Sequence, residues 1–442
     1  MVRRREVLVS GWSEREPDDL VYANLRGATG TVKRVLCEVF LPNPDSPELV
    51  LHFLPKPRQF YGLHQRGPFS LTARGREGGY RFAIRGEQVW VSGLSSGGKD
   101  GIAFVTACEG RPAWLERTVI YGGRAGTRVA QGRFRLTECP IVNAASIIMR
   151  SYTGAVRVKR VVVPGFTLRC GLTIRFKRFF DTTHGKSGQA TSSPYLAAEF
   201  RPAKPLRKAD FPRAVEEFEQ FLLLTSFASR FRCVWLEWDY LDERHSINRH
   251  FRQDALRPKG PPKPLNDSLI DVADFPEFIR KVCVAYYKLG SPTLLSSALN
   301  ALLAEGGFLE DDFLRYFSGL QSALWYVYRA HGGTKRFVGV EDLYRFFETK
   351  HSVDLGDLWP LFDVSKGVSL TRVRNRLAHG EPFVQRELEA LGCALQHLRW
   401  VVERVVLAIL GWPIDRSKVR AESLRTHYLA YKWDSSIRGI AP

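Results

Sequence analysis

Arg374, Asn375 and His379 lie close together in the chain and carry the groups needed to break a phosphodiester bond. A histidine imidazole transfers protons near neutral pH. A guanidinium binds phosphate oxygens and stabilises the negative charge that grows on them during the reaction. An asparagine can orient either the imidazole or the ribose. These three residues are the candidate catalytic set, for a reaction in which we expect no metal ion and no cofactor.

The segment around these residues has the pattern of an amphipathic helix, predicted over residues 367–379. Three apolar side chains recur at spacings of three and four and predict a buried stripe, namely Leu370, Val373 and Leu377. Gly380 and Pro382 follow and predict the end of the helix. Arg372 and Arg376 belong to the polar part of this helix. We expect them either to position a substrate or to be ordinary surface charges.

The sequence Arg374-Asn-Arg-Leu-Ala-His379 resembles the signature of HEPN domains, small all-helical modules that are often ribonucleases. The order of the whole chain resembles the ApeA-like proteins of prokaryotic anti-phage defence, in which a β-rich domain precedes the HEPN domain. The resemblance implies an endoribonuclease in abortive-infection defence whose active site is completed in a homodimer. It gives His379 the role of acid and base, Arg374 that of phosphate stabiliser and Asn375 that of orienting residue.

The same resemblance implies the partners of the protein. The substrate would be RNA, and transfer RNA is one candidate because its exposed loops let a ribose 2′-OH swing into line. A phage-derived trigger would act on the N-terminal domain. The sequence departs from the HEPN pattern at Trp325, which stands where an acidic residue is common. This departure puts in doubt any role that needs a carboxylate beside the motif.

The composition indicates a basic globular protein with polyanionic partners. The chain has 65 Lys and Arg against 46 Asp and Glu, a formal net charge of +19. Residues 51–200 hold 23 basic and 8 acidic side chains, a net charge of +15, whereas residues 301–400 hold 12 and 13. The seven cysteines show no zinc-site spacing. We expect reduced thiols, a cytoplasmic location and no membrane segment.

The N-terminal half predicts a β-rich domain, because short apolar or alternating runs are separated by Gly, Pro, Asn and Asp. Their spacing favours a sandwich or a barrel-like pair of sheets. Strands are expected at residues 7–10, 35–41, 49–54, 80–84, 88–91, 102–107, 133–136, 156–163, 168–176, 195–201 and 233–238. Turns are expected at residues 95–101 and 122–126, a loop at residues 182–193 and one helix at residues 211–231.

Arginines alternate along several of these strands and so share one face of a sheet. The pairs are Arg81 and Arg85, Arg133 and Arg135, Arg157 and Arg160, and Arg175 and Arg178. Phenylalanines interleave with them at positions 82, 134, 176 and 179. One hypothesis is a face that binds single-stranded nucleic acid. The alternative is an ordinary solvated face with the aromatic rings in the core.

The C-terminal half predicts an all-helical bundle. A proline-rich linker at residues 257–266 separates a β-rich sensing or regulatory domain (1–256) from a HEPN helical domain (267–412), and residues 413–442 form a tail. Further helices are expected at residues 275–289, 292–304, 310–330, 340–348 and 385–410. The overall expectation is an α+β multidomain protein. The alternative function is a non-catalytic RNA-binding or sensor protein whose helical bundle serves for dimerisation.

Overall fold

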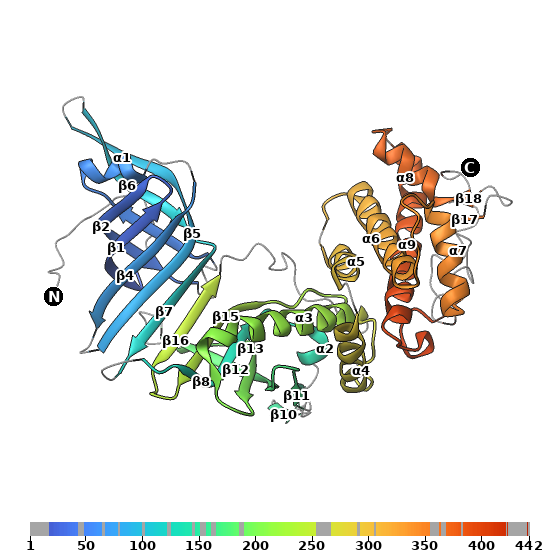
Figure 1. Ribbon diagram of the computed structural model, residues 1–442, viewed down its shortest axis with the longest axis horizontal. Coiled ribbons are helices and arrows are strands. Elements are labelled where there is room, and N and C mark those ends of the chain that lie inside the picture. Colours follow the sequence, from blue (N-terminus) through green and yellow to red (C-terminus); the bar gives the residue numbers. More distant parts are fainter. Residues whose placement is uncertain are drawn as a thin grey trace.

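The computed structural model describes residues 17–42, 48–63, 67–77, 80–99, 102–121, 125–143, 146–150, 156–160, 165–184, 190–252, 267–289, 292–304, 306–353, 362–363, 368–381, 383–420, 422 and 440. A large antiparallel sheet occupies the N-terminal half, and helices occupy the C-terminal half (Figure 1). The expected α+β layout is confirmed at this level. None of the helices in the described ranges combines the length and the apolar character needed to cross a bilayer.

The first strands of the sheet close on themselves. Strands β4, β1, β2, β3 and β6 pair in that order, and the long strand β5 pairs with both β4 and β6. This cycle agrees with the barrel-like alternative for the first part of the domain. The bounds are β1 Asp19–Gly27, β2 Gly30–Phe40, β3 Val50–Leu54, α1 Pro57–Leu63, β4 Phe69–Glu77, β5 Tyr80–Lys99 and β6 Ile102–Arg111.

The sheet then continues away from the cycle through β7 and β16 to β15, β8, β13, β12 and β11. Helix α3 lies along this second part (Figure 1) and packs its phenylalanines on it. The ring of Phe218, for example, stacks on Phe134 of β8 at 4.2 Å. The bounds are β7 Trp114–Ile120, β8 Arg128–Leu136, α2 Pro140–Asn143, β11 Phe166–Thr167, β12 Leu172–His184, β13 Ala190–Pro202, β14 Leu206–Arg207, α3 Phe211–Ser229, β15 Trp235–Asp242 and β16 Ile247–Arg252. A separate hairpin joins β9 Ser146–Arg150 and β10 Val156–Arg160.

The helical half has long amphipathic helices, each of which buries its apolar stripe. Helix α6 contacts α5, α7, α8 and α9, so it lies at the centre of this half. The bounds are α4 Phe275–Lys288, α5 Pro292–Leu303, α6 Leu309–Ala330, α7 Val340–His351, β17 Phe362–Asp363, β18 Val368–Ser369, α8 Leu370–Ala378 and α9 Leu388–Ile409. Every helix expected in this half is present.

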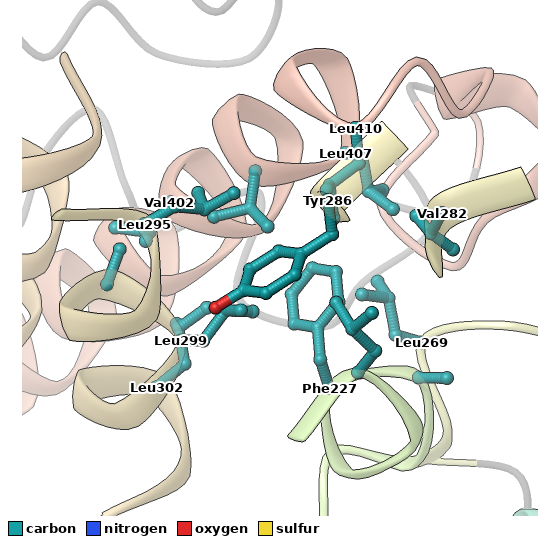
Figure 2. Packing of buried hydrophobic residues seen from close by; sticks show 14 of the residues in the cluster. Phe227, Leu269, Val282, Tyr286, Leu295, Leu299, Leu302, Val402, Leu407 and Leu410 are labelled. Atoms are coloured by element: carbon teal, nitrogen blue, oxygen red, sulfur yellow. The ribbon is translucent and has the colours of Figure 1, made fainter. Parts of the chain in front are cut away.

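The buried apolar residues form two clusters. One fills the closed cycle of β1 to β6 and extends to Phe251. The other runs from the second part of the sheet through α3 into the helical half. Figure 2 shows this continuity around Tyr286 of α4, whose ring lies among Phe227 of α3, Leu299 of α5 and Leu407 of α9. The β-rich half and the helices therefore share a core. The predicted linker at 257–266 lies outside the described residues, so the domain boundary stays a prediction.

Several local predictions were wrong. The runs expected as separate strands at 80–84 and 88–91 belong to the single strand β5, which also includes residues 95–99 of an expected turn. The expected loop at 182–193 contains the paired ends of β12 and β13. The strand expected at 7–10 lies outside the described residues. Part of the expected tail packs on the helices, since Val419 is fully buried and its carbonyl accepts a hydrogen bond from Arg404 Nε at 2.7 Å.

Candidate functional site

Helix α8 is anchored at its beginning and open at its end. Leu370 and Val373 are fully buried, as the apolar stripe predicted. The hydroxyl groups of Ser369 and Thr371 lie 3.2 and 3.5 Å from Glu341 Oε1, at the start of α7. The first turn of α8 is thereby tied to the bundle. The motif residues are left in the last turns.

The end of α8 is built by glycine, as expected. The backbone N–H of His379 donates to the carbonyl of Asn375 at 2.9 Å, so these two residues lie one turn apart. Gly380 then adopts a φ of +73°, and its N–H donates to the Leu377 carbonyl at 3.0 Å. The N–H of Glu381 reaches the Arg376 carbonyl at 3.1 Å. The polypeptide turns sharply at this point, which leaves His379 on the rim of the helix end.

The three candidate catalytic side chains are solvent-exposed. Arg374 donates from Nη1 to Asn375 Oδ1 at 3.0 Å, so the carboxamide holds the guanidinium at the surface. No described carboxylate forms an ion pair with Arg374, so its charge is available to an anion. The arrangement presents a cation, an amide and an imidazole at the tip of one helix. None of these three side chains is buried in the core.

The two arginines expected to contact the substrate differ in their surroundings. Arg372 is exposed, whereas Arg376 is half-buried and lies over the ring of Phe383, with its guanidinium carbon 4.0 Å from the ring centroid. Both terminal nitrogens of Arg376 reach Glu387, at 3.2 and 3.0 Å. The Arg376 guanidinium therefore joins α8 to the segment that leads into α9. This arrangement favours a structural role for Arg376, which is neither of the two alternatives expected for this residue.

Trp325 is half-buried in α6, where it makes an edge contact with Tyr328 and lies under the guanidinium of Arg329. It lines an open groove of about 830 Å³ together with Phe337, whose side chain is 89% exposed. The carboxylates in contact with α8 come from Glu341 and Glu387 instead. The sequence analysis identified neither carboxylate. Glu341 lies at the start of α7 and Glu387 just before α9, and neither belongs to the apolar repeat of its helix.

The arginines that alternate in the sheet fall into two groups. Arg133 pairs with Asp239 at 2.8 Å, and Arg178 approaches Glu138 at 3.4 Å. Arg81 and Arg85 are exposed on the outer side of β5, whereas Phe82 between them is buried. Phe134 and Phe176 are also buried, so these rings belong to the core. The side chains of Arg157 and Arg160 lie outside the described residues.

Within the described ranges, no three His, Cys, Asp or Glu side chains gather as a metal site would require. Comparison of the sequence with protein-family models gave no match, and comparison with curated proteins gave none either. The case for a function therefore depends on the residues of this chain and on their geometry.

Proposed function

We propose that the protein is a HEPN-type endoribonuclease that needs no metal ion and cleaves RNA at the exposed end of α8. The observation that carries the proposal is the joint exposure of Arg374, Asn375 and His379 at that end, with Arg374 bonded to Asn375 and to no carboxylate of the described residues. The resemblance of residues 374–379 to the HEPN signature supports it. A defence role, transfer RNA as substrate and a phage-derived trigger are parts of the same proposal.

The proposed step is an attack of the ribose 2′-oxygen on the adjacent phosphorus. The new P–O2′ bond forms as the P–O5′ bond breaks, which leaves a 2′,3′-cyclic phosphate and a 5′-hydroxyl. A base takes the 2′-OH proton and an acid gives a proton to O5′. Arg374 stabilises the charge that grows on the non-bridging oxygens, and His379 moves a proton.

One copy of α8 offers a single imidazole, whereas the step moves two protons. A symmetric dimer in which two α8 ends face one another would supply both. The exposed position of His379 at a sharp turn is compatible with such an approach. The specific activity should then fall when the protein is diluted below the dissociation constant of the dimer.

The test uses the full-length protein and its His379→Ala and Arg374→Ala variants, each incubated with total RNA and a chelator. Arg345→Ala removes an exposed arginine from α7 and serves as the matched control. We expect cleavage by the wild type and by the control, unaffected by chelator, and none by the other two. Cyclic phosphate at the new 3′ ends would identify the step. Equal cleavage by all four proteins would refute the proposed site.

The second candidate is a non-catalytic RNA-binding or sensor protein. The tryptophan at position 325, where the HEPN pattern commonly has a carboxylate, favours it. In that case all four proteins would bind RNA and none would cleave it. The proposal also includes a cytoplasmic location, which the seven cysteines support because they form no disulfide. Expression in a host challenged with phage tests the defence role, because protection should be lost in His379→Ala.

A further inference from the structure

A basic groove lies on the outer side of the sheet, far along the chain from α8. It has a volume of about 1240 Å³ and is open to solvent. Residues of strands β1, β4, β5 and β7 line it, together with Lys208 and Asn248. Four arginines line it: Arg74, Arg76, Arg81 and Arg85. All four are exposed, because the alternation of β4 and β5 points their side chains away from the core.

Two of these arginines stand directly opposite one another. In the β4–β5 hairpin, Arg76 pairs in register with Arg81. Like charges at directly opposed positions of an antiparallel pair destabilise the sheet. No carboxylate of the described residues pairs with Arg74, Arg76 or Arg81. The positive charge at this place is therefore uncompensated within the described part of the molecule, which is the electrostatic condition for binding an anion.

The other charged groups of the groove are already matched. Lys208 Nζ lies 2.9 Å from Asp242 Oδ2, and Arg85 stands opposite Glu116 in the β5–β7 register. Burial raises the pKa of Glu116, and the charges of Arg85 and Lys208 oppose this shift. The excess charge of the groove thus belongs to Arg74, Arg76 and Arg81.

An exposed aromatic ring accompanies the free arginines. Tyr22 of β1 lines the groove and is 45% exposed. The guanidinium carbon of Arg34 lies over its ring, 5.6 Å from the ring centroid. A flat ring next to guanidinium groups offers a stacking platform for an unpaired base, and the guanidinium groups offer contacts for the neighbouring phosphates.

We infer that this groove binds a single-stranded segment of RNA, with its phosphates on Arg74, Arg76 and Arg81 and a base on Tyr22. The charge and the exposed ring of Tyr22 carry the assignment to a single strand. The choice of RNA over DNA rests on the proposed function of α8. The groove would hold RNA while a different part of the chain cleaves it, or would sense RNA where no cleavage occurs.

The test measures the binding of a fluorescent RNA oligomer by the full chain carrying His379→Ala, so that cleavage cannot interfere. In the triple variant Arg74→Ala, Arg76→Ala and Arg81→Ala we expect affinity to fall about 100-fold near physiological salt. The salt dependence should also weaken, by about 2 in the slope of log K against log salt. Tyr22→Ala should weaken binding about tenfold. Tyr22→Phe should keep the affinity of the protein with Tyr22, because stacking needs only the ring.

The control triple Arg213→Ala, Arg280→Ala and Arg345→Ala removes the same charge from exposed positions on α3, α4 and α7. It should retain most of the affinity. Equal losses of RNA affinity in the two triple variants would refute binding in the groove, because net charge alone would then explain the binding. Equal or tighter binding of a duplex, of a DNA oligomer of the same sequence or of anionic vesicles would overturn the assignment to single-stranded RNA. Since every binding protein carries His379→Ala, failure here leaves the cleavage test unaffected.

Discussion

Arg230 and Glu403 form a partly buried ion pair between the long helix of the β-rich half and the last long helix of the bundle. Arg230 Nε donates to Glu403 Oε1 at 2.8 Å, and a second guanidinium nitrogen reaches the other carboxylate oxygen. The Glu403 side chain is 2% exposed. Arg230 caps α3 with a φ of +52°, a conformation in which glycine would be less strained. We interpret the arginine there as a connection between the two halves.

Loss of this pair should destabilise the protein strongly. Glu403→Ala would leave the partly buried guanidinium groups of Arg230 and Arg399 without this carboxylate, at a cost of about 3 kcal/mol in the free energy of unfolding. Denaturant unfolding measures this loss. Asp210→Ala breaks the exposed Arg207–Asp210 pair and is the matched control, expected to cost far less stability than Glu403→Ala because solvent screens the pair. Similar losses in both variants would contradict the connecting role.

Alanine substitutions of Arg376 and Arg372 should differ in their effect on the stability of the protein. Arg376→Ala removes the contacts to Glu387 and Phe383, so α8 should loosen and the free energy of unfolding should fall by about 1–2 kcal/mol. Arg372→Ala removes an exposed side chain and should change stability by less than about 0.5 kcal/mol. Thermal unfolding of both variants checks this. If Arg376→Ala proves as stable as the wild type and loses only RNA affinity, the substrate-contact alternative is right for Arg376.

The protein should lose stability in mild acid because of His250. This histidine stacks on Trp238 at 4.5 Å, and burial, aided by the charge of Arg252, lowers its pKa from 6.5 to about 4. Between pH 6.5 and pH 4 this histidine is protonated in the unfolded chain but neutral in the folded protein. Its contribution to the free energy of unfolding is therefore fully present above pH 6.5 and decreases as the pH falls towards 4. Burial also lowers the pKa of His397, which acts in the same direction.

His250→Phe keeps a ring between the tryptophans and removes the titrating group. We expect the decrease in unfolding free energy between pH 7 and pH 4.5 to become smaller, by on the order of 1–3 kcal/mol. Part of the decrease should persist because His397 still titrates. Chemical unfolding at a series of pH values measures the difference. A pH dependence identical to that of the wild type would show that His250 is not the responsible group.

The helices were predictable because their periodicity is local. Helix α6 begins one residue before its predicted start and ends where predicted, since its apolar residues recur at three and four along the whole length. The predicted start of α8 was three residues too early, because Val368 and Ser369 pair with β17 instead. The candidate catalytic residues were found for the same reason, since they lie within two turns of one helix.

The sheet was harder to predict because its outer face breaks the expected alternation. Strand β1 was missed, since Leu20 and Tyr22 are apolar yet exposed, which conceals the period of two. The same exposed side chains belong to the basic groove, so a functional surface obscured the structural signal. The Arg76–Arg81 opposition could have been read from the two glycines that follow Glu77. Tyr22 reaches the groove through the pairing of β1 with β4, and Lys208 lies there beside Asp242; no local sequence pattern shows either contact.

The like-charged pair predicts that stability and RNA binding change in opposite directions. Arg81→Thr removes the repulsion with Arg76 and places a β-branched residue in a strand, so the free energy of unfolding should rise by about 0.2–1 kcal/mol. The same substitution removes one phosphate contact and should weaken RNA binding about fivefold. Arg85→Thr is the matched control in the same strand. It stands opposite Glu116, so it removes an attraction and should lower stability. A loss of stability in Arg81→Thr would show that the two guanidinium groups do not repel one another, and the argument for an anion between them would fail.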